Sequence, residues 1–484
     1  MARLQIFLPT RASVMSKRLV TVVVTVTMLA ASVTGQKNLQ RPPIKTPDTF
    51  RGLGPAPPAE LTSIGDLKWF EVFKDEELQK LLKTAFIQNY DLRAAVARIN
   101  AERANLGLVR SNQFPQVEAS ADLTTTRFSQ NGLVAIPRES GTRRSVGSVL
   151  LNLLSFELDI WGRRRNETKA ARALLRASEE DRKTVLTTVV SDVASGYFSL
   201  LELDGELDIA RRTLATRENS LLLIKLRQEG GVATLLDLRQ GEELVYQASQ
   251  TIPDIERLIE QTENQISLLL GNNPGPIPRG KSLTEQQELP AVPTGLPSSL
   301  LERRPDIRSA EQNLVAQGAL VSAARAAYFP TISLSGFLGF ESSQLSSLFT
   351  GPSKAWSFVP QITAPIFTAG RLKSNVKFAK AQQEFAVVQY QQTIQTAFRE
   401  VSDALVQYRK EKEIRAQQEF LVTTLQDRSR LAYLRYQGGV DTLLNALDAD
   451  RDLFNAELSL TQTRRNELLS LVQLYKALGG GWQE

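Results

Sequence analysis

The sequence of 484 residues contains no cysteine and no histidine. A chain without thiols and imidazoles forms no disulfide and lacks the usual zinc ligands, thiolate nucleophiles and Ser-His-Asp or Cys-His arrangements. Its 42% apolar residues and net charge of +6 are compatible with a folded protein, and its basic residues are spread among acidic ones. Carboxylates, lysines, tyrosines and hydroxyl groups remain as possible catalysts, and we expect no nucleic-acid partner.

Long apolar runs are also lacking, except close to the N-terminus. Residues 19–33 read "LVTVVVTVTMLAASV" and follow the basic residues Arg11, Lys17 and Arg18. Because this run is short for a membrane-spanning helix and ends in small residues, it predicts a signal peptide over residues 1–35, and hence export. A single-span anchor is the alternative, and Met15 is a second candidate for the first residue.

Proline is missing from residues 138–252 and 366–484 but crowded into residues 41–58 and 273–297. The crowded stretches predict an extended N-terminal segment over 36–66 and a linker over 273–297, and a tail covers 478–484. The proline-free stretches predict helices of about 65 residues, on the order of 100 Å long, from Gly162 and from Gly370. Apolar residues within the second helix recur at the three- and four-residue spacing of a coiled-coil seam: Phe398, Val401, Leu405 and Tyr408.

The chain repeats itself. Residues 227–238 read "RQEGGVATLLDL" and residues 435–447 read "RYQGGVDTLLNAL", 208 positions later. A longer match joins residues 89–115 to residues 304–330, with an offset of 215. This duplication predicts two repeats, 67–272 and 298–477, each with a helix, a β-hairpin and a long helical hairpin whose tip is the Gly-Gly pair.

Between the predicted helices, apolar and polar residues alternate. In "VEASADLTT" and "LSFELDI" the apolar residues are Val117, Ala119, Ala121, Leu123, Leu154, Phe156, Leu158 and Ile160; the second half has Ile332, Leu334, Trp356, Phe358 and Ile362. This alternation predicts four strands of roughly ten residues in two hairpins. They belong either to a soluble half-buried sheet or to a transmembrane barrel with a watery lumen. Four strands do not close a barrel, so in lipid three copies would supply twelve.

These segments resemble the TolC-like outer-membrane efflux proteins, or outer membrane factors, and within them the OprM-like drug-efflux lipoproteins. The resemblance rests on "WFEVFKDEELQKLLKTAFIQNYDLRAAVARI", "ELDIWGRRR", "LLERRPDIRSAEQNLVAQGALVSAARAAYFPTISLSG", "APIFTAGR", "RYQGGVDTLLNALDADRDLFNAE" and "LYKALGGGW". It implies an α+β membrane protein: a homotrimer with a twelve-stranded outer-membrane barrel, a long periplasmic helical barrel and a collar built partly from the termini.

One position departs from this subgroup. Its members carry Leu-x-Gly-Cys, in which the cysteine becomes acylated, whereas this chain reads "VTGQKN" with Gln36 at that place. Either the barrel alone anchors this protein among the outer-membrane lipids, or the sequence carries a substitution there. One acyl chain is a marginal anchor, so its loss need not prevent insertion of a trimeric barrel.

The resemblance gives the Gly-Gly tips a function. Six tips in a trimer would form a ring at the periplasmic end, and the grooves between them would receive a periplasmic adaptor, also called a membrane fusion protein. The expected docking residues are Gly230, Gly231, Val232, Leu235, Gly438, Gly439, Val440 and Leu443, with Arg227 and Arg435 near the contact. The alternative is that the glycines only close each hairpin.

Acidic residues near the tip predict an aperture. Asp441 and Asp448 are seven residues apart, so on one helix they share a face with Asn445 between them, and Asp237 is the counterpart of Asn445. Carboxylates from three chains would form a cation-favouring constriction, in which Arg435 is a candidate to pair with Asp441. Arg227 and Arg435 are therefore expected at the aperture together with these acids. Stabilisation of the helix N-terminus is the alternative for Asp441.

The sequence as a whole therefore indicates a passive exit channel of a tripartite efflux pump in the outer membrane of a Gram-negative-type bacterium. An inner-membrane transporter of the resistance-nodulation-division type would supply the energy. Two alternatives within transport are an exit duct for type I protein secretion and one for metal-ion efflux. An alternative of another class is a periplasmic coiled-coil scaffold without a pore. For such a channel we expect no enzyme activity, no catalytic residue, no metal and no cofactor, and its cargo stays open.

Overall fold

The computed structural model describes residues 47, 50–51, 63–127, 143–286 and 297–482. The predicted signal peptide over 1–35 and the lipidation position Gln36 lie outside the described residues, as do most of the predicted N-terminal segment and part of the predicted linker. All statements below concern the described residues of the body formed by residues 45–484.

The two halves of this body contain helices of equal lengths. Two 22-residue helices precede the strands, two 67-residue helices follow them, and two 35-residue helices return from the Gly-Gly turns. In chain order these are α4 (Tyr90–Ser111), α5 (Arg163–Glu229), α6 (Leu235–Leu269), α8 (Pro305–Ala326), α9 (Arg371–Gln437) and α10 (Leu443–Ala477). The expected coiled-coil seam is present, since Val401 and Leu405 are buried and Phe398 and Tyr408 pack against the same core.

The four expected strands form one antiparallel sheet in the order β1-β2-β3-β4: β1 (Val117–Arg127), β2 (Arg143–Leu158), β3 (Thr331–Ser342) and β4 (Lys354–Thr363). Strand β2 is longer than expected and ends before Ile160. Cross-strand register places the alternating apolar residues on one face, where Leu151 opposes Leu338 and Leu338 opposes Trp356. That face is open, with Trp356 74% exposed, and β1 and β4 have unpaired outer edges. Such a sheet requires lipid on one face and further strands at its edges.

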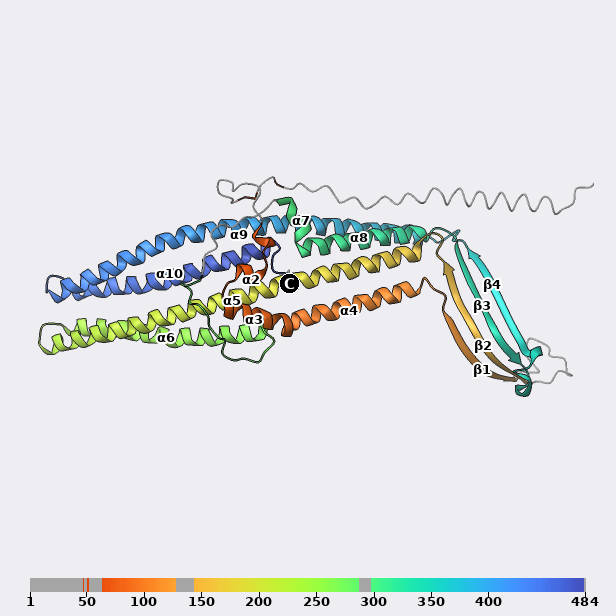
Figure 1. The fold of residues 1–484 in the computed structure, drawn as a ribbon, viewed down its shortest axis with the longest axis horizontal. Coiled ribbons are helices and arrows are strands. Elements are labelled where there is room, and N and C mark those ends of the chain that lie inside the picture. The colour runs from red at the N-terminus through yellow and green to blue at the C-terminus, as the bar shows by residue number, and fades with distance from the viewer. Residues whose placement is uncertain (1–46, 48–49, 52–62, 128–142, 287–296, 483–484) are drawn as a thin grey trace, which may run out of the picture. The chain divides into compact units, whose positions relative to one another are not determined.

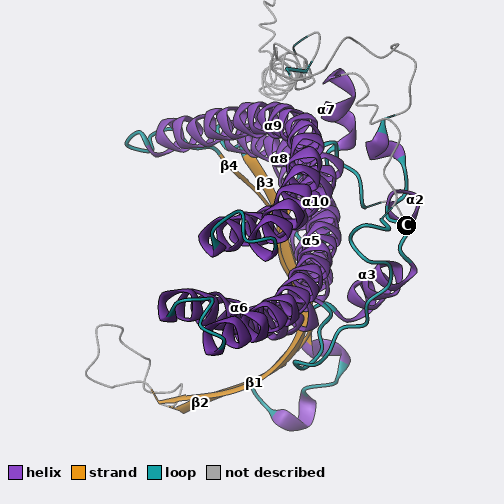
Figure 2. Cartoon of the chain, turned by 90° about the vertical axis from the view of Figure 1, so that its left-hand side faces the viewer, coloured by secondary structure: helices purple, strands orange, loops and turns teal. Residues whose placement is uncertain are grey.

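The long helices form a curved layer, which Figure 2 shows from the end opposite the sheet. Toward the Gly-Gly turns the order across this layer is α6, α5, α10 and α9; toward the sheet it is α4, α5, α8 and α9. The sheet and the Gly-Gly turns therefore lie at opposite ends of the helices (Figure 1).

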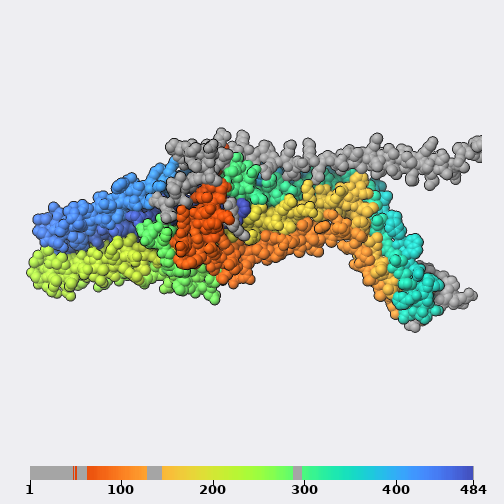
Figure 3. Space-filling model, viewed as in Figure 1, coloured from red at the N-terminus to blue at the C-terminus, as the bar shows by residue number. Residues whose placement is uncertain are grey.

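The main hydrophobic core lies midway along the helices, where α3 (Glu76–Gln88) and the short helix α2 (Trp69–Val72) cover them (Figure 3). Asp75 organises this region. Its carboxylate caps α3 through the N–H groups of Glu77 and Leu78, and also accepts hydrogen bonds from Tyr197 Oη (3.2 Å) and from the side chain of Gln286 (2.9 Å). This single buried carboxylate ties α3 and α5 to the segment between the repeats.

Helix α5 contains the one described stretch that is long and apolar enough to cross a membrane by length and composition. However, 61% of that stretch is buried inside the protein. Its apolar residues, among them Val190, Val193 and Ala194, belong to the main core. We therefore interpret α5 as a core helix.

Candidate functional site at the Gly-Gly turns

Both Gly-Gly pairs end their helices with the same backbone motif. In the first turn, the N–H of Val232 donates to the carbonyl of Arg227 (2.8 Å) and the N–H of Gly231 to that of Gln228 (3.0 Å). The second turn repeats the pattern, from Val440 to Arg435 (3.1 Å) and from Gly439 to Tyr436 (3.0 Å). Gly231 and Gly439 have φ angles of +71° and +72°, a region that residues with a side chain rarely adopt. The second glycine of each pair is therefore required by the backbone alone.

The predicted docking residues differ in exposure. Val232 and Val440 are 69% and 67% exposed, and Leu235 is also open. Leu443 is only 3% exposed, because it packs into a cluster formed by Ile224, Leu244, Tyr436, Ala446 and Leu447. The prediction that Leu443 offers a surface contact is therefore wrong for this subunit. Leu444, the next residue, is exposed in its place, as is its counterpart Leu236.

In the first turn, the predicted aperture residues make local contacts. Asp237 forms a capping box with Thr234: the Thr234 hydroxyl accepts from the N–H of Asp237 (3.1 Å), and the Asp237 carboxylate accepts from the N–H of Thr234 (2.7 Å). The Arg227 guanidinium lies over the ring of Tyr436, 4.7 Å from its centre. Arg227 thus connects the first hairpin to the second.

The seven-residue spacing predicted that Asp441 lies on the returning helix, but in the second turn Asp441 precedes that helix. Helix α10 begins at Leu443 with Thr442 as its N-cap, because the left-handed Gly439 extends the turn as far as Thr442. The expected pairing is nevertheless present, since Arg435 Nε lies 3.1 Å from the Asp441 carboxylate. Asp441 also accepts hydrogen bonds from the Asn445 amide (2.7 Å) and the N–H of Thr442 (2.8 Å). Donation first from Asn445, then from Arg435 and Thr442, holds the pKa of Asp441 below its ordinary value.

Asp448 lies within α10 and is half-exposed. Arg451, one turn further along, approaches its carboxylate to 3.1 Å. A partner three residues away on the same helix leaves the carboxylate accessible to solvent, and such an exposed pair contributes little stability. The Asp448 carboxylate is therefore paired but accessible to solvent, and its part in an aperture remains a prediction.

A buried ion pair, which the sequence patterns did not predict, joins the two helical hairpins. Arg217 on α5 lies 2.7 Å from Asp450 on α10, and their side chains are 3% and 9% exposed. Arg217 also donates to the carbonyl of Leu244 on α6 (3.0 Å) and lies over the ring of Phe454. A signal existed: Leu443, Leu447, Asp450 and Phe454 follow the seam spacing, so a charge stands where an apolar residue is expected.

This end of the protein therefore combines two hydrogen-bonded, solvent-exposed turns with a small set of charged side chains. Its contacts are ion pairs, caps, a stacking interaction and the apolar cluster around Leu443. Within the part of the chain that the structure describes, no cluster of three potential metal ligands is found. The arrangement is suited to contact with another surface and to narrowing a passage.

Comparison with known proteins identifies the family. The family model described as "Outer membrane efflux protein" matches residues 81–272 and 296–480, which are nearly the whole of both repeats. The antibiotic efflux pump outer membrane protein ArpC of Pseudomonas putida is 40% identical over 418 residues, covering 86% of this chain and 85% of ArpC. The toluene efflux pump outer membrane protein TtgF of Pseudomonas putida is 40% identical over 422 residues, 87% of each chain.

Solved structures show the same fold. The open state of the Neisseria gonorrhoeae MtrE outer membrane channel is similar with a TM-score of 0.82 and 31% sequence identity, covering 92% of this chain and 98% of that one. The fold is thus one subunit of a TolC-like trimer, in which three four-stranded sheets complete a twelve-stranded barrel in the outer membrane and the helices form a periplasmic barrel. The chain belongs to the outer membrane efflux protein family, whose members are exit channels of tripartite efflux pumps.

Proposed function

We propose that this channel receives its cargo from a periplasmic adaptor that docks at the Gly-Gly turns, and that an inner-membrane transporter of the resistance-nodulation-division type supplies the energy. The proposal is supported mainly by the paired turns, which have the same backbone geometry and expose Val232 and Val440 at the end opposite the sheet. Glycine at these positions lets a partner backbone approach closely. The channel itself is passive and carries out no chemistry.

The docking surface consists of residues from both turns. From the first turn it includes Gly230, Gly231, Val232 and Leu235, and from the second Gly438, Gly439, Val440 and the exposed Leu444 in place of Leu443. Arg227 stacks on Tyr436 and Arg435 pairs with Asp441, so both arginines hold the shape of the surface. Exposed valine and leucine side chains on rigid turns fit the apolar face of a partner helix.

The resting aperture lies close to the second turn. Asp448 presents a half-exposed carboxylate, and Asp441 is held in place by Arg435 and Asn445. Three copies of such a group around an axis produce a ring of negative charge that attracts cations and narrows the passage. Asp237 contributes less to this ring, because its carboxylate is occupied in the capping box.

The cargo is of the small-molecule class for which the relatives are named. ArpC is named for antibiotics and TtgF for toluene. In a tripartite arrangement the transporter selects the cargo, so the channel needs only a lumen wide enough to pass it. Expression of this chain with a matching transporter and adaptor should therefore restore tolerance to antibiotics or solvents in a strain that lacks its own exit channel.

Planar bilayers test the aperture directly. The double variant Asp441→Ala with Asp448→Ala should show higher single-channel conductance than the wild type and weaker block by multivalent cations, because it removes both bulk and negative charge. Asp452→Ala provides a matched control, since Asp452 is a half-exposed acid on the same helix that pairs with Arg428. Discrete conductance steps that are identical in all three proteins would locate the aperture elsewhere; the absence of any steps would contradict the channel function.

A further inference from the structure

A row of positive charges lies on α5 just below the sheet. Its members follow one another by four, three and four residues and so share one face of the helix: Arg165, Lys169, Arg172 and Arg176. All four are exposed, whereas every residue between them is buried or partly buried. Arg165 pairs with Asp159 (3.2 Å), but among the described residues no ion pair is found for the other three. The row ends at an acid, Glu179. Three neighbouring cations are therefore free to bind an anion.

These side chains form the floor of a groove between α4 and α8. Arg110 on α4 lines one side of the groove, and Gln312 and Val315 on α8 line the other. The volume of the groove is about 540 Å³, which is enough for a phosphate-bearing headgroup. Arginine and lysine dominate its lining, and none of the described residues that line it is acidic. A groove lined by charges of one sign concentrates ligands of the opposite sign, so this one favours anions.

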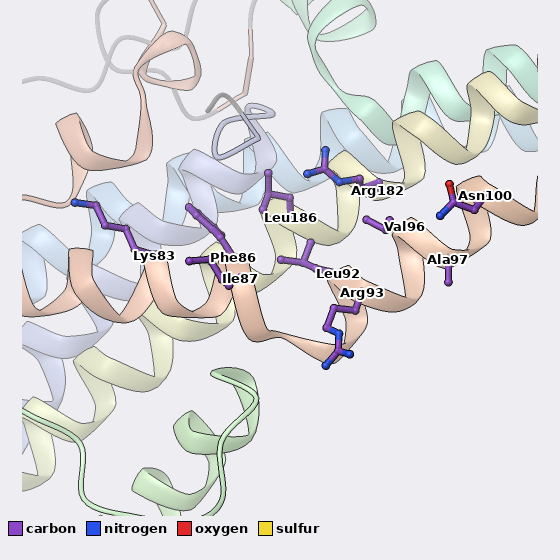
Figure 4. A pocket seen from close by; sticks show the side chains of 10 residues that line it. All are labelled: Lys83, Phe86, Ile87, Leu92, Arg93, Val96, Ala97, Asn100, Arg182 and Leu186. Carbon is purple, nitrogen blue, oxygen red and sulfur yellow. The ribbon is translucent and has the colours of Figure 1, made fainter. Parts of the chain in front are cut away.

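The groove opens on the convex side of the helical layer. Two steps of seven residues along α5 lead from Arg172 to Leu186 and from Arg176 to Val190, so all four share one face. Leu186 and Val190 belong to the main core, and Leu186 lines a mostly apolar cavity together with Phe86 of α3 (Figure 4). Figure 2 shows α2 and α3 on the convex side. In a closed barrel the convex side faces the periplasm, so the groove lies outside the path of the cargo.

The groove also lies at the level where the membrane meets the helices. Strand β2 ends at Leu158, and α5 begins at Arg163 directly below it (Figure 1). Lys169, Arg172 and Arg176 span roughly 10 Å along the helix. Because Cα–Cβ bonds tilt toward the N-terminus of a helix, and the N-terminus of α5 is its end beside the sheet, these side chains lean toward the membrane.

The second repeat carries the same row. With the offset of 208 residues, the first three cations correspond to exposed lysines on α9, which are Lys373, Lys377 and Lys380. Three steps of seven residues lead from Lys380 to Val401, which belongs to the main core, so this row faces the same convex side. Only the lower end differs, because Glu384 stands where Arg176 stands in the first row. Each subunit therefore has two such rows, and a trimer has six around its outer surface.

From this placement we propose that the two rows bind the phosphate groups of anionic phospholipids in the periplasmic leaflet of the outer membrane, with the α5 groove as the main headgroup site. Arg172 and Arg176 bind phosphate through paired N–H groups, and Lys169 binds it as a point charge. The ligand is a lipid, because its acyl chains continue along the apolar face of the sheet directly above. Such contacts fix the depth of the barrel in the membrane.

Native mass spectrometry tests the α5 groove. The trimer in detergent is titrated with an equimolar mixture of phosphatidylglycerol and phosphatidylethanolamine that have the same acyl chains, and the bound molecules of each are counted. The wild type should prefer phosphatidylglycerol. Lys169→Gln with Arg172→Gln and Arg176→Gln should lower this preference by about fivefold for each cation removed. Glutamine is a good helix former, so the helix should persist. An unchanged preference would overturn the proposal.

Two controls separate a local site from a general effect of charge. Lys225→Gln with Arg239→Gln and Arg257→Gln also removes three exposed cations, but near the Gly-Gly turns, and should leave the preference unchanged. Equal losses in both triple variants would reduce the rows to part of the net charge. Glycerol 3-phosphate, which has the phosphate ester but no acyl chains, should not displace phosphatidylglycerol. Displacement at equal concentration would assign the groove to a soluble anion and overturn the lipid assignment.

A second measurement places the rows outside the channel. Lys373→Gln with Lys377→Gln and Lys380→Gln should lower the lipid preference further when it is combined with the α5 variant; no additional loss would overturn the part of the proposal that concerns α9. Single-channel conductance in planar bilayers should be the same in the wild type and in both row variants, because the rows lie on the convex side. A changed conductance would place these side chains in the lumen and overturn the proposal while leaving the channel function standing.

Discussion

The two helical hairpins have equal lengths but different surroundings. Helices α5 and α9 both run for 67 residues, yet 25 residues of α5 are buried against 11 of α9. Helix α5 lies inside the curved layer, whereas α9 is its edge. Duplication thus preserved the backbone, while position in the layer decided how much of each helix is buried within one subunit.

The two Gly-Gly turns likewise share a backbone conformation but differ in their side chains. Their backbone hydrogen bonds are nearly identical, but Ala233 stands in the first turn where Asp441 stands in the second. The first turn stabilises its returning helix through the Thr234–Asp237 capping box, and the second through a cluster around Asp441. The glycines determine the turn, and side chains that do not affect it are free to diverge.

The largest effect is expected where the two hairpins are joined. Arg217→Met leaves Asp450 buried without its partner, and breaking a buried pair in this way costs about 3–5 kcal/mol of unfolding free energy. The denaturation midpoint of the trimer should fall, and hydrogen exchange should rise in α5 and α10 together.

Two further variants make that prediction specific. Arg217→Met with Asp450→Leu should recover most of the loss, because no buried charge is left. Arg211 lies on α5, as Arg217 does, and forms an exposed ion pair with Glu256 on α6. Arg211→Met should therefore change the free energy of unfolding by less than about 1 kcal/mol. If Arg217→Met behaved like Arg211→Met, the buried pair would not join the hairpins.

The next effect concerns the glycines. Gly231→Val and Gly439→Val force a side chain into the left-handed region, at a cost of about 1–2 kcal/mol or more for each turn. Dye efflux in cells should be lost while native mass spectrometry still finds trimers. Gly230→Ala and Gly438→Ala separate backbone strain from partner contact: their φ angles of −79° and −74° accept a side chain, so a loss of efflux in these variants reports the docking contact alone. Normal efflux in both valine variants would mean that these turns are not the docking surface.

A smaller effect should distinguish the two N-caps. Thr234→Ala removes a side-chain cap and should destabilise the start of α6 by about 1 kcal/mol. The Thr442 side chain makes no capping hydrogen bond, so Thr442→Ala should leave the start of α10 nearly unchanged. Hydrogen exchange at the two turns measures both, and equal responses would show that the caps do not differ in solution.

The smallest effect is a pH dependence confined to the second turn. The Asp441 carboxyl binds its proton more weakly in the folded turn than in the unfolded chain, because the folded-state pKa is lowered. Its contribution is therefore complete above the ordinary value of about 3.9 and is lost as the pH falls through the lowered pKa. Hydrogen exchange should be faster in Asp441→Ala than in the wild type at neutral pH, and this difference should vanish in acid. A difference that persisted in acid would assign the effect to something other than the charge.

Much of the fold could be predicted because it depends on local patterns. The absence of proline and the seam spacing indicated the long helices, and alternation indicated four strands with one apolar face. The errors lie where a boundary or a partner matters. The spacing of Asp441 and Asp448 predicts that both lie on one helix, but spacing does not show at which residue a helix begins after a left-handed glycine. Helix α10 begins at Leu443, two residues after Asp441. Leu443 was placed on the surface, although the ring of Tyr436 and the aliphatic side chains around it bury it.

What the sequence determined by itself is the repeat, the approximate lengths of the long helices, the family and the position of each Gly-Gly turn, because helix periodicity and glycine's left-handed φ are properties of short segments. Only the tertiary structure decided that Arg217 meets Asp450, that Arg227 stacks on Tyr436, and that α4 and α9 keep open faces where α8 and α5 are covered. Those outcomes depend on which helices become neighbours, and two segments with almost the same sequence acquire different roles when one lies inside the layer and the other at its edge.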